Sequence, residues 1–150
     1  MFESEIPAMD IFVRLLMAAG LALLLGLERE LRGKPAGLRS HMLVSVGAAA
    51  FILIGLHILM TTAEGDPSAR IDPSRIVEGV IGGIGFLGAG CIIQGRGSVQ
   101  GITTGASIWI SGAIGVACGL GTLVLASMVT VLALIIVVVL GRFERDVIEE

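Results

Sequence analysis

Long apolar runs separated by short polar segments dominate this chain. A bilayer core of about 30 Å requires roughly 20 apolar residues from each helix that crosses it. Five runs reach this length or come close to it, at residues 11–27, 42–60, 76–93, 102–118 and 122–140. The pattern predicts an all-α fold, a polytopic membrane helix bundle of about five transmembrane helices that forms one transmembrane domain over residues 1–150.

The fourth run is the shortest and the most polar of the five, so we expect its helix to be tilted or buried among its neighbours. Only Gly119, Leu120 and Gly121 separate it from the fifth run. A connection this short predicts that the fourth and fifth helices are antiparallel neighbours.

Composition supports a membrane protein. Hydrophobic residues make up 55% of the chain and charged residues only 15%, whereas ordinary soluble domains carry roughly 25% charged residues. The mean hydropathy is +0.96. The expected partner is therefore the lipid bilayer. A net charge of −3 argues against nucleic acid as a partner, because no basic face is available to neutralise phosphates.

Basic residues in short loops predict the orientation in the membrane. One side would carry Arg29, Arg32, Lys34, Arg39, Arg96, Arg142 and Arg145, and the other Arg14, Arg70 and Arg75. This bias predicts an N-terminus outside and a C-terminus in the cytoplasm. The acidic segment 1–10 lacks the basic start of a signal peptide, so we expect the first apolar run to be retained as a membrane anchor.

Small residues follow two of the predicted helices. The fourth carries Thr103, Ser107, Ser111, Gly115 and Gly119 at every fourth position, and the third carries Gly79, Gly82, Gly83, Gly85, Gly88 and Gly90. Small residues on one face allow close approach of membrane helices. We therefore expect glycine-rich close packing and, on these ridges alone, a homodimer. A broken or re-entrant third helix is the alternative.

The sequence predicts neither an enzyme nor a cofactor. Residues 83–88 match a dinucleotide-binding fingerprint but lack the preceding strand and the later acidic residue. Cys91 and Cys118 lie in apolar runs and are expected to be buried thiols. Glu78, early in the third helix, is a weak candidate for a metal ligand. An interfacial carboxylate paired with Arg75 is the alternative, and no other metal ligand is expected.

The segment 26–41 concentrates charge between the first two helices. Glu28 and Arg32 are spaced for an i,i+4 pair on a helix that continues past the membrane. Charged groups packed against membrane helices are costly unless they are paired. Two interpretations stay open at this point, a topology signal and a functional site.

Four segments in order give a specific resemblance. They are Gly-Leu-Glu-Arg-Glu at 26–30, Ala-Gly-Leu-Arg-Ser at 36–40, Gly-Ile-Gly-Phe-Leu-Gly-Ala-Gly at 83–90 and Gly-Ile-Thr-Thr-Gly-Ala-Ser-Ile-Trp at 101–109. Through them the chain resembles the MgtC/SapB family of bacterial inner-membrane proteins. The resemblance implies a five-helix membrane domain and a role in adaptation to low magnesium, including virulence and survival inside host cells.

The resemblance also implies candidate functional residues. Glu28, Arg29 and Arg39 would form a polar site, with Ser40 standing where relatives often have threonine. Thr103 and Thr104 would add polar lining, and Gly83, Gly85, Gly88 and Gly90 close packing. Many relatives continue into a soluble cytoplasmic domain, whereas this sequence stops soon after residue 146, so we expect no soluble C-terminal domain in this chain.

Two functions from different classes remain. The first is a non-enzymatic modulator that binds another membrane protein, for which the small-residue faces are suited. The second is a small transporter or channel for Mg²⁺ or another solute. No acidic residue lies clearly at mid-membrane, although Mg²⁺ is bound through oxygen ligands and commonly carboxylates.

Overall fold

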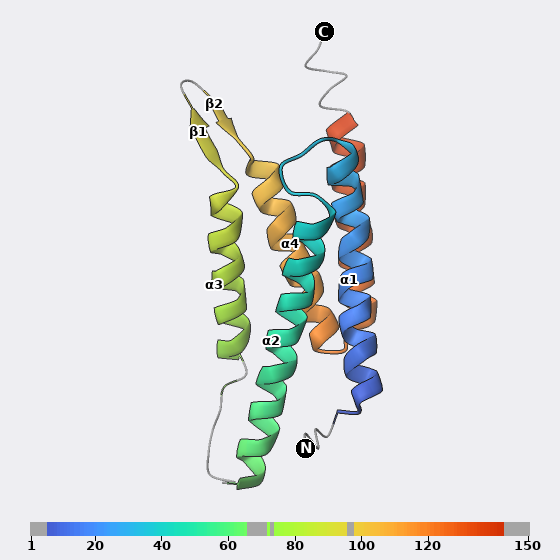
Figure 1. Ribbon diagram of the computed structural model, residues 1–150, viewed down its shortest axis with the longest axis vertical. Coiled ribbons are helices and arrows are strands. Elements are labelled where there is room, and N and C mark those ends of the chain that lie inside the picture. The colour runs from blue at the N-terminus through green and yellow to red at the C-terminus, as the bar shows by residue number, and fades with distance from the viewer. Residues whose placement is uncertain (1–5, 66–71, 73, 96–97, 143–150) are drawn as a thin grey trace.

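The computed structural model describes residues 6–65, 72, 74–95 and 98–142, and it is a bundle of five helices (Figure 1). The helices are α1 (Ala8–Leu31), α2 (Leu38–Gly65), α3 (Ser74–Gly90), α4 (Ile102–Gly119) and α5 (Leu123–Ile135). A π-helical turn, η1 (Ile136–Leu140), continues α5, and two short strands, β1 (Ile93–Gly95) and β2 (Ser98–Gln100), join α3 to α4. The predicted all-α bundle of five helices is confirmed.

Four helical segments are long and apolar enough to cross a membrane: Ala8–Leu31, Leu38–Thr62, Ile102–Gly119 and Leu123–Leu140. The shorter α3 has 17 residues. Successive helices alternate in direction, so the end of α1, the start of α2, the hairpin and the end of η1 lie at one end of the bundle (Figure 1). We call this the loop end. The start of α1, the end of α2 and the α4–α5 turn lie at the opposite end.

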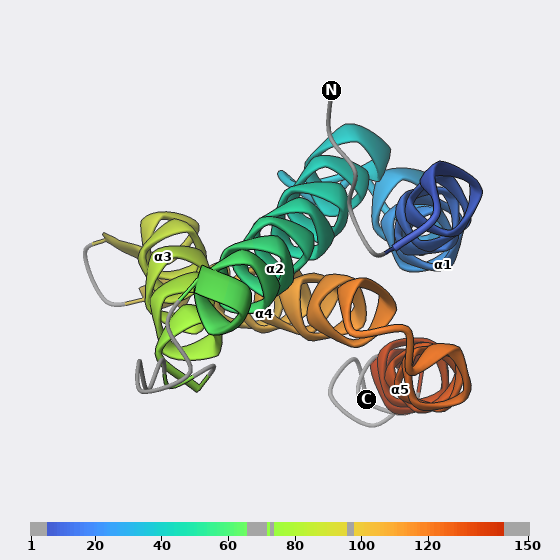
Figure 2. The same ribbon diagram turned by 90° about the horizontal axis from the view of Figure 1, so that it is seen from below.

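Helix α4 is the centre of the bundle. It packs against all four other helices, and Figure 2 shows it between α3 on one side and α5 on the other. The expectation that the fourth helix is buried among its neighbours is confirmed, because 61% of its apolar window is buried. Its antiparallel arrangement with α5 follows from the short turn, in which Gly121 has a φ of +80°.

Glycine allows α4 to approach its neighbours closely. A Cβ at Gly115 would clash with the backbone oxygen of Ser45 on α2, and one at Gly105 would lie 2.6 Å from the backbone oxygen of Gly88 on α3. The small-residue column of the fourth helix is therefore used inside the chain. Ser107, Ser111, Gly115 and Gly119 of this column are buried, and Gly115 and Gly119 pack against α2, whereas Thr103 is exposed. The homodimer expected from the small-residue ridges stays a prediction.

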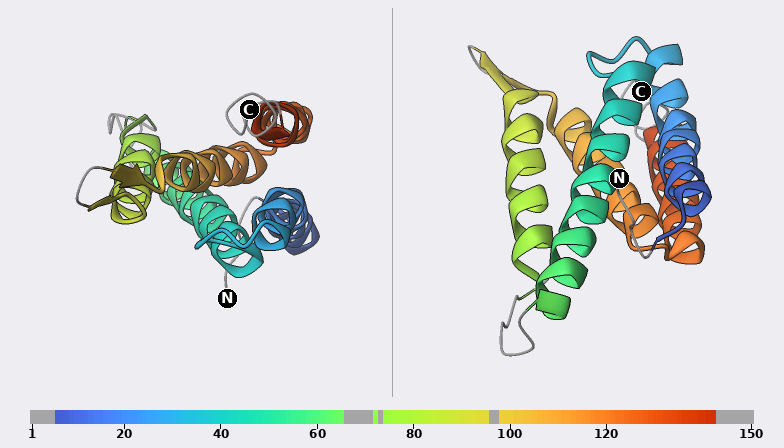
Figure 3. Two further views of the ribbon diagram at one scale, coloured as in Figure 1. Left: turned by 90° about the horizontal axis from the view of Figure 1, so that it is seen from above. Right: turned by 60° about the horizontal axis from the view of Figure 1, so that its bottom comes forward.

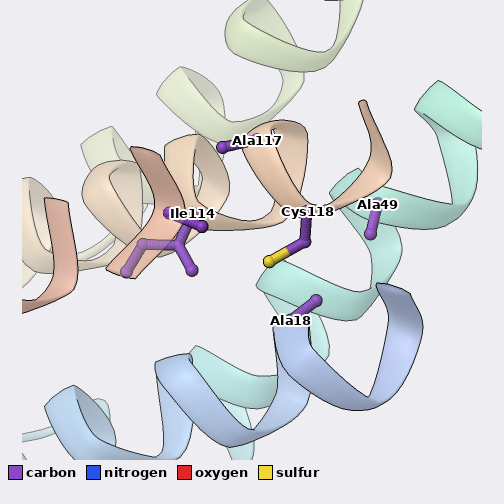
Figure 4. Close-up of a cluster of buried hydrophobic side chains, with 6 residues drawn as sticks. Ala18, Ala49, Ile114, Ala117 and Cys118 are labelled. Atoms are coloured by element: carbon purple, nitrogen blue, oxygen red, sulfur yellow. The ribbon is translucent and has the colours of Figure 1, made fainter. Parts of the chain in front are cut away.

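The apolar core lies where α1, α2 and α4 meet. Figure 4 shows Ala18, Ala49, Ile114 and Cys118 close together there, and all four are fully buried. Small side chains at this junction keep the three helices close together. Cys118 is a buried free thiol as expected, whereas Cys91, at the end of α3, is only half-buried.

The third helix is shorter than the sequence predicts. It ends at Gly90, and β1 and β2 then pair antiparallel as a hairpin, with Ile93 opposite Gln100. The expected helix over 76–93 extends too far because Ile92 and Ile93 continue the apolar run, although β-branched residues next to glycine also favour a strand. The hairpin returns to α4 through Gly101, whose φ is +87° and where a Cβ would clash with the carbonyl oxygen of Cys91.

Candidate functional site

The candidate site lies at the loop end, where α1 meets the start of α2. Helix α1 continues beyond the predicted apolar run to Leu31. It approaches α2 closely at Gly26, where a Cβ would lie 2.9 Å from the Cα of Leu38 and 3.2 Å from the Cβ of His41. This approach brings the charged last turn of α1 against the first turns of α2.

The connection between the two helices is held by local hydrogen bonds. Gly33 adopts a φ of +61°, and the backbone N–H of Lys34 donates to the oxygen of Arg29 at 3.0 Å, which closes α1 in a left-handed C-terminal cap. The carboxylate of Glu30 then accepts the N–H of Leu38 at 3.0 Å. A carboxylate at the first N–H groups of a helix stabilises its N-terminus, so Glu30 fixes where α2 begins.

A buried ion cluster occupies the last turns of α1. Glu28 Oε1 lies 2.5 Å from Arg32 Nε, and Glu28 Oε2 lies 3.7 Å from Arg29 Nη1. The exposed fractions of the side chains are 4% for Arg29, 10% for Glu28 and 19% for Arg32. The predicted Glu28–Arg32 pair is confirmed. One carboxylate faces two guanidinium groups, so the cluster is net positive.

The cluster also connects α1 to the last helical turns of the chain. Arg32 Nη2 donates to the oxygen of Val138 in η1 at 3.4 Å. Arg29 is less well satisfied, because its Nε is buried and has no hydrogen-bond partner among the described residues. A buried guanidinium with incomplete partners is costly. Arg29 therefore depends on its neighbouring charges to remain in place.

A second polar network joins α2 to α4 next to this cluster. His41 is fully buried; its Nδ1 lies 2.7 Å from the oxygen of Gly37 and its Nε2 lies 3.1 Å from Ser107 Oγ. Ser107 Oγ donates to the oxygen of Thr104 at 2.8 Å. Gly26, one turn before Arg29 on α1, brings the cluster close to this network, because a Cβ at Gly26 would lie 3.2 Å from the Cβ of His41. The two networks thus form one polar centre at the loop end of an otherwise apolar bundle.

The structure brings together only part of the site expected from sequence. Glu28 and Arg29 lie in the cluster. Thr104 is buried, and its backbone oxygen accepts the Ser107 hydroxyl that contacts His41. Thr103 and Arg39 are exposed. Ser40 is half-buried on the first turn of α2. Among the described residues, no hydrogen bond or ion pair joins Arg39 to the cluster.

The glycines predicted to pack closely fall into two groups. Gly88 lies against Gly105 of α4. Around Gly79, Gly83, Gly85 and Gly90, by contrast, no atom lies within 4 Å of the position that a Cβ would take. These four therefore supply no close packing within the chain. On α4, Ser107 and Ser111 are both buried, and Ser111 Oγ donates to the oxygen of Ser107.

Glu78 is exposed on α3. Across residues 6–65, 72, 74–95 and 98–142, no ion pair joins it to Arg75, and no group of three His, Cys, Asp or Glu side chains could hold a metal ion. A pair at i,i+4 spacing is present near the start of α1, with Arg14 Nη2 2.7 Å from Asp10 Oδ2.

Sequence reasoning misses His41 and Glu30. No other metal-binding residue lies at helical spacing from His41, so the sequence does not indicate a metal site there. The absence of a metal site does not reveal that His41 joins two helices. A signal is nevertheless available, since His41 and Ser45 are four residues apart on an apolar helix and thus share one face. Polar residues inside membrane helices are expected to find partners on another helix, and here Ser107 is that partner.

Comparison with known proteins identifies relatives. A family model described as the MgtC family matches residues 15–146. The chain is 37% identical over 127 residues to the putative magnesium transporter YhiD of Escherichia coli K12, covering 85% of this chain and 59% of that protein. It is 44% identical over 118 residues to protein SrpB of Synechococcus elongatus, covering 72% and 62%. It is 42% identical over 108 residues to protein MgtC of Brucella abortus, covering 72% and 42%.

The chain therefore spans about 42–62% of the length of these relatives. No solved structure matches it. The resemblance inferred from the four sequence segments is confirmed by the family model and by these relatives.

Proposed function

Because this chain belongs to the MgtC family, we propose that it is a non-enzymatic membrane protein that modulates another membrane system during adaptation to low magnesium. In a pathogen, this role extends to virulence and intracellular survival. Support for the link to magnesium comes from the relatives, one of which is named a putative magnesium transporter.

The observation that carries the proposal is the sign of the charge in the buried polar centre. Glu28 is accompanied by both Arg29 and Arg32. Mg²⁺ is bound through oxygen ligands, commonly carboxylates, and keeps several waters. Two guanidinium groups beside a single carboxylate repel a divalent cation and are suited to fixing the helix ends instead. A modulator needs such a fixed surface at the loop end, where a partner can be recognised.

The proposal also places the protein in the bacterial inner membrane with its loop end in the cytoplasm. Among the described residues, Arg29, Arg32, Lys34, Arg39 and Arg142 lie at the loop end, and Arg14 and Arg75 lie toward the opposite end. Short loops rich in Lys and Arg remain on the cytoplasmic side. This bias favours an N-terminus outside and a C-terminus inside. Arg70, Arg96 and Arg145, which also entered the prediction, lie outside the described residues.

A transporter is the second candidate, and one feature favours it. Hydroxyl groups of Thr104, Ser107 and Ser111 on α4 and of Ser45 on α2 are buried together in the bundle. Ser45 Oγ has no hydrogen-bond partner among the described residues. A column of buried hydroxyls could exchange hydrogen bonds with a polar solute. If the protein is a transporter, the purified chain must carry a solute across a membrane. If it is a modulator, no solute flux is required.

Growth in low magnesium tests the proposal. A strain lacking this chain should regain growth with the wild-type gene and with Lys34→Gln, an exposed loop residue at the same end. Glu28→Gln should fail to restore growth when strains with equal amounts of inserted protein are compared. Equal rescue by Glu28→Gln and Lys34→Gln would contradict a role for the buried cluster.

A further inference from the structure

An open apolar groove runs between α2 and α3. Its volume is about 850 Å³, and apolar side chains from both helices line it, including Phe51 and Ile54 on α2 and Leu87 on α3. Helix α3 lies at the periphery of the bundle (Figure 3). Its contact with α2 is much smaller than the contact between α4 and α2. The groove therefore faces outward, toward the membrane, and is not filled by this chain.

Three of the four glycines that line this groove are not required by the packing of the single chain; the fourth, Gly55, lies against Ile76. Gly47, Gly79 and Gly83 all border it, and no atom lies within 4 Å of a Cβ position at any of them. Elsewhere in the bundle, helical glycines such as Gly105 and Gly115 stand where a Cβ would clash with another helix. Glycine inside a helix is less stable than alanine. Small residues along a membrane-facing groove allow the backbone of another helix to approach.

The outward face of α3 adds a charged element. One face of the helix is formed by residues spaced four, three and four positions apart, namely Arg75, Gly79, Gly82 and Phe86. Phe86 is 79% exposed on this face. Glu78 lies one turn beyond Arg75, and both charged residues are exposed. Among the described residues neither is part of an ion pair.

We propose that a second copy of this chain occupies the groove with its own α3, forming a parallel homodimer. Copies inserted in the same orientation are related by a two-fold axis along the membrane normal, so equivalent residues meet at the same depth. Arg75 lines the groove, and Glu78 lies one turn further along α3, outside the lining. Arg75 of each copy then pairs with Glu78 of the other, and the pair forms twice. This self-complementary charge favours a second copy over a lipid chain or an unrelated helix.

The dimer is measured by energy transfer between donor- and acceptor-labelled full chains in vesicles of increasing lipid-to-protein ratio. The wild-type chain should show transfer that persists on dilution. Gly79→Leu and Gly83→Leu should raise the dissociation constant by roughly tenfold or more, because the added side chains separate the two backbones. Both positions have open space in the single chain, so the variants should keep their helical content, measured by circular dichroism.

The matched control is Gly20→Leu. Gly20 is an exposed glycine on α1 with no atom within 4 Å of a Cβ position, and it lies outside the groove. This variant should dimerise as the wild-type chain does. A wild-type chain that remains monomeric would overturn the proposal. Equal affinities for Gly79→Leu and Gly20→Leu would also overturn it.

Charge exchange tests the choice of occupant. Arg75→Glu and Glu78→Arg should each weaken the dimer by repulsion between copies, and the variant with both changes should recover it. If neither single change weakens association, the reciprocal pairs are absent and the proposed geometry is wrong. If transfer is absent but anionic lipid quenches a probe in the groove, a lipid occupies it and the second copy is excluded.

Discussion

Nε2 of His41 lies 3.1 Å from Oγ of Ser107, and this contact links α2 to α4 inside the bundle. The Ser107 hydroxyl has one proton, which it donates to the oxygen of Thr104. Nδ1 faces the oxygen of Gly37, which can only accept. Nδ1 therefore carries a proton and donates it to Gly37. If the Ser107 hydroxyl rotates to donate to Nε2 instead, it gives up its hydrogen bond to Thr104. The ring nitrogens and the Ser107 hydroxyl are thus committed to partners on α2 and α4.

Loss of the Ser107 hydroxyl should destabilise the bundle. Ser107→Ala leaves His41 Nε2 buried without its partner, and an unsatisfied buried polar group costs about 1–3 kcal/mol. The free energy of unfolding, measured in detergent micelles, should fall by that amount. Thr103→Val, on the exposed face of the same helix, should change it by less than about 0.5 kcal/mol. Equal effects of the two changes would show that the His41–Ser107 bond contributes nothing.

Removing the carboxylate of Glu28 should be more costly. Glu28→Gln leaves Arg29 and Arg32 without a counter-charge, and breaking a buried ion pair on one side costs about 3–5 kcal/mol. Adding Arg29→Met should recover part of this loss, because the uncompensated guanidinium is removed. The same unfolding measurement on the two variants checks both parts. A double variant less stable than Glu28→Gln alone would mean that Arg29 is stabilised by something other than Glu28.

A methyl group at Gly115 should force α2 and α4 apart. Its Cβ would clash with the backbone oxygen of Ser45 and lie 2.8 Å from the Cβ of Ala48. Overpacking of this kind costs about 1–3 kcal/mol, so the melting temperature of Gly115→Ala should fall. Gly20→Ala should instead stabilise α1, by up to about 1 kcal/mol. A stabilised Gly115→Ala would contradict the close packing of α4 on α2.

The stability of the first turn of α3 should depend on pH, because the Asp72 carboxylate accepts hydrogen bonds there. Hydrogen bonds from the Ser74 side chain and backbone hold the pKa of the Asp72 carboxyl below its usual range. A carboxyl whose pKa is lowered by folding stabilises the folded form above its unfolded pKa of about 3.9, and the contribution is lost as pH falls through the folded pKa. The protection factors of amides in the first turn of α3, which are relative to the intrinsic exchange rate at each pH, should therefore fall in acid. In Asp72→Asn this loss of protection should be absent; if it persists, another group is responsible.

The periodic features of the fold could be predicted from sequence. Apolar length alone located five helices, and the polarity of the fourth run correctly indicated a buried helix. The hairpin after Gly90 could not be predicted in this way, because Ile92 and Ile93 are as apolar as the helix before them and only tertiary context decides between helix and strand.

The site was predicted in part for a related reason. The i,i+4 spacing of Glu28 and Arg32 is local, so sequence sufficed for that pair. The contact between His41 and Ser107 joins residues 66 positions apart, and nothing local reports it. The roles of the glycines were likewise hidden, since Gly88 and Gly83 lie on the same helix but only Gly88 faces α4 closely.

Magnesium flux into proteoliposomes containing the purified full chain tests the central claim most directly. The account predicts that protein shown to be folded and inserted gives no more Mg²⁺ uptake than empty vesicles, and that Glu28→Gln gives the same result. Uptake that requires the protein and is lost in Glu28→Gln would contradict the account and identify the buried polar centre as part of a transport pathway.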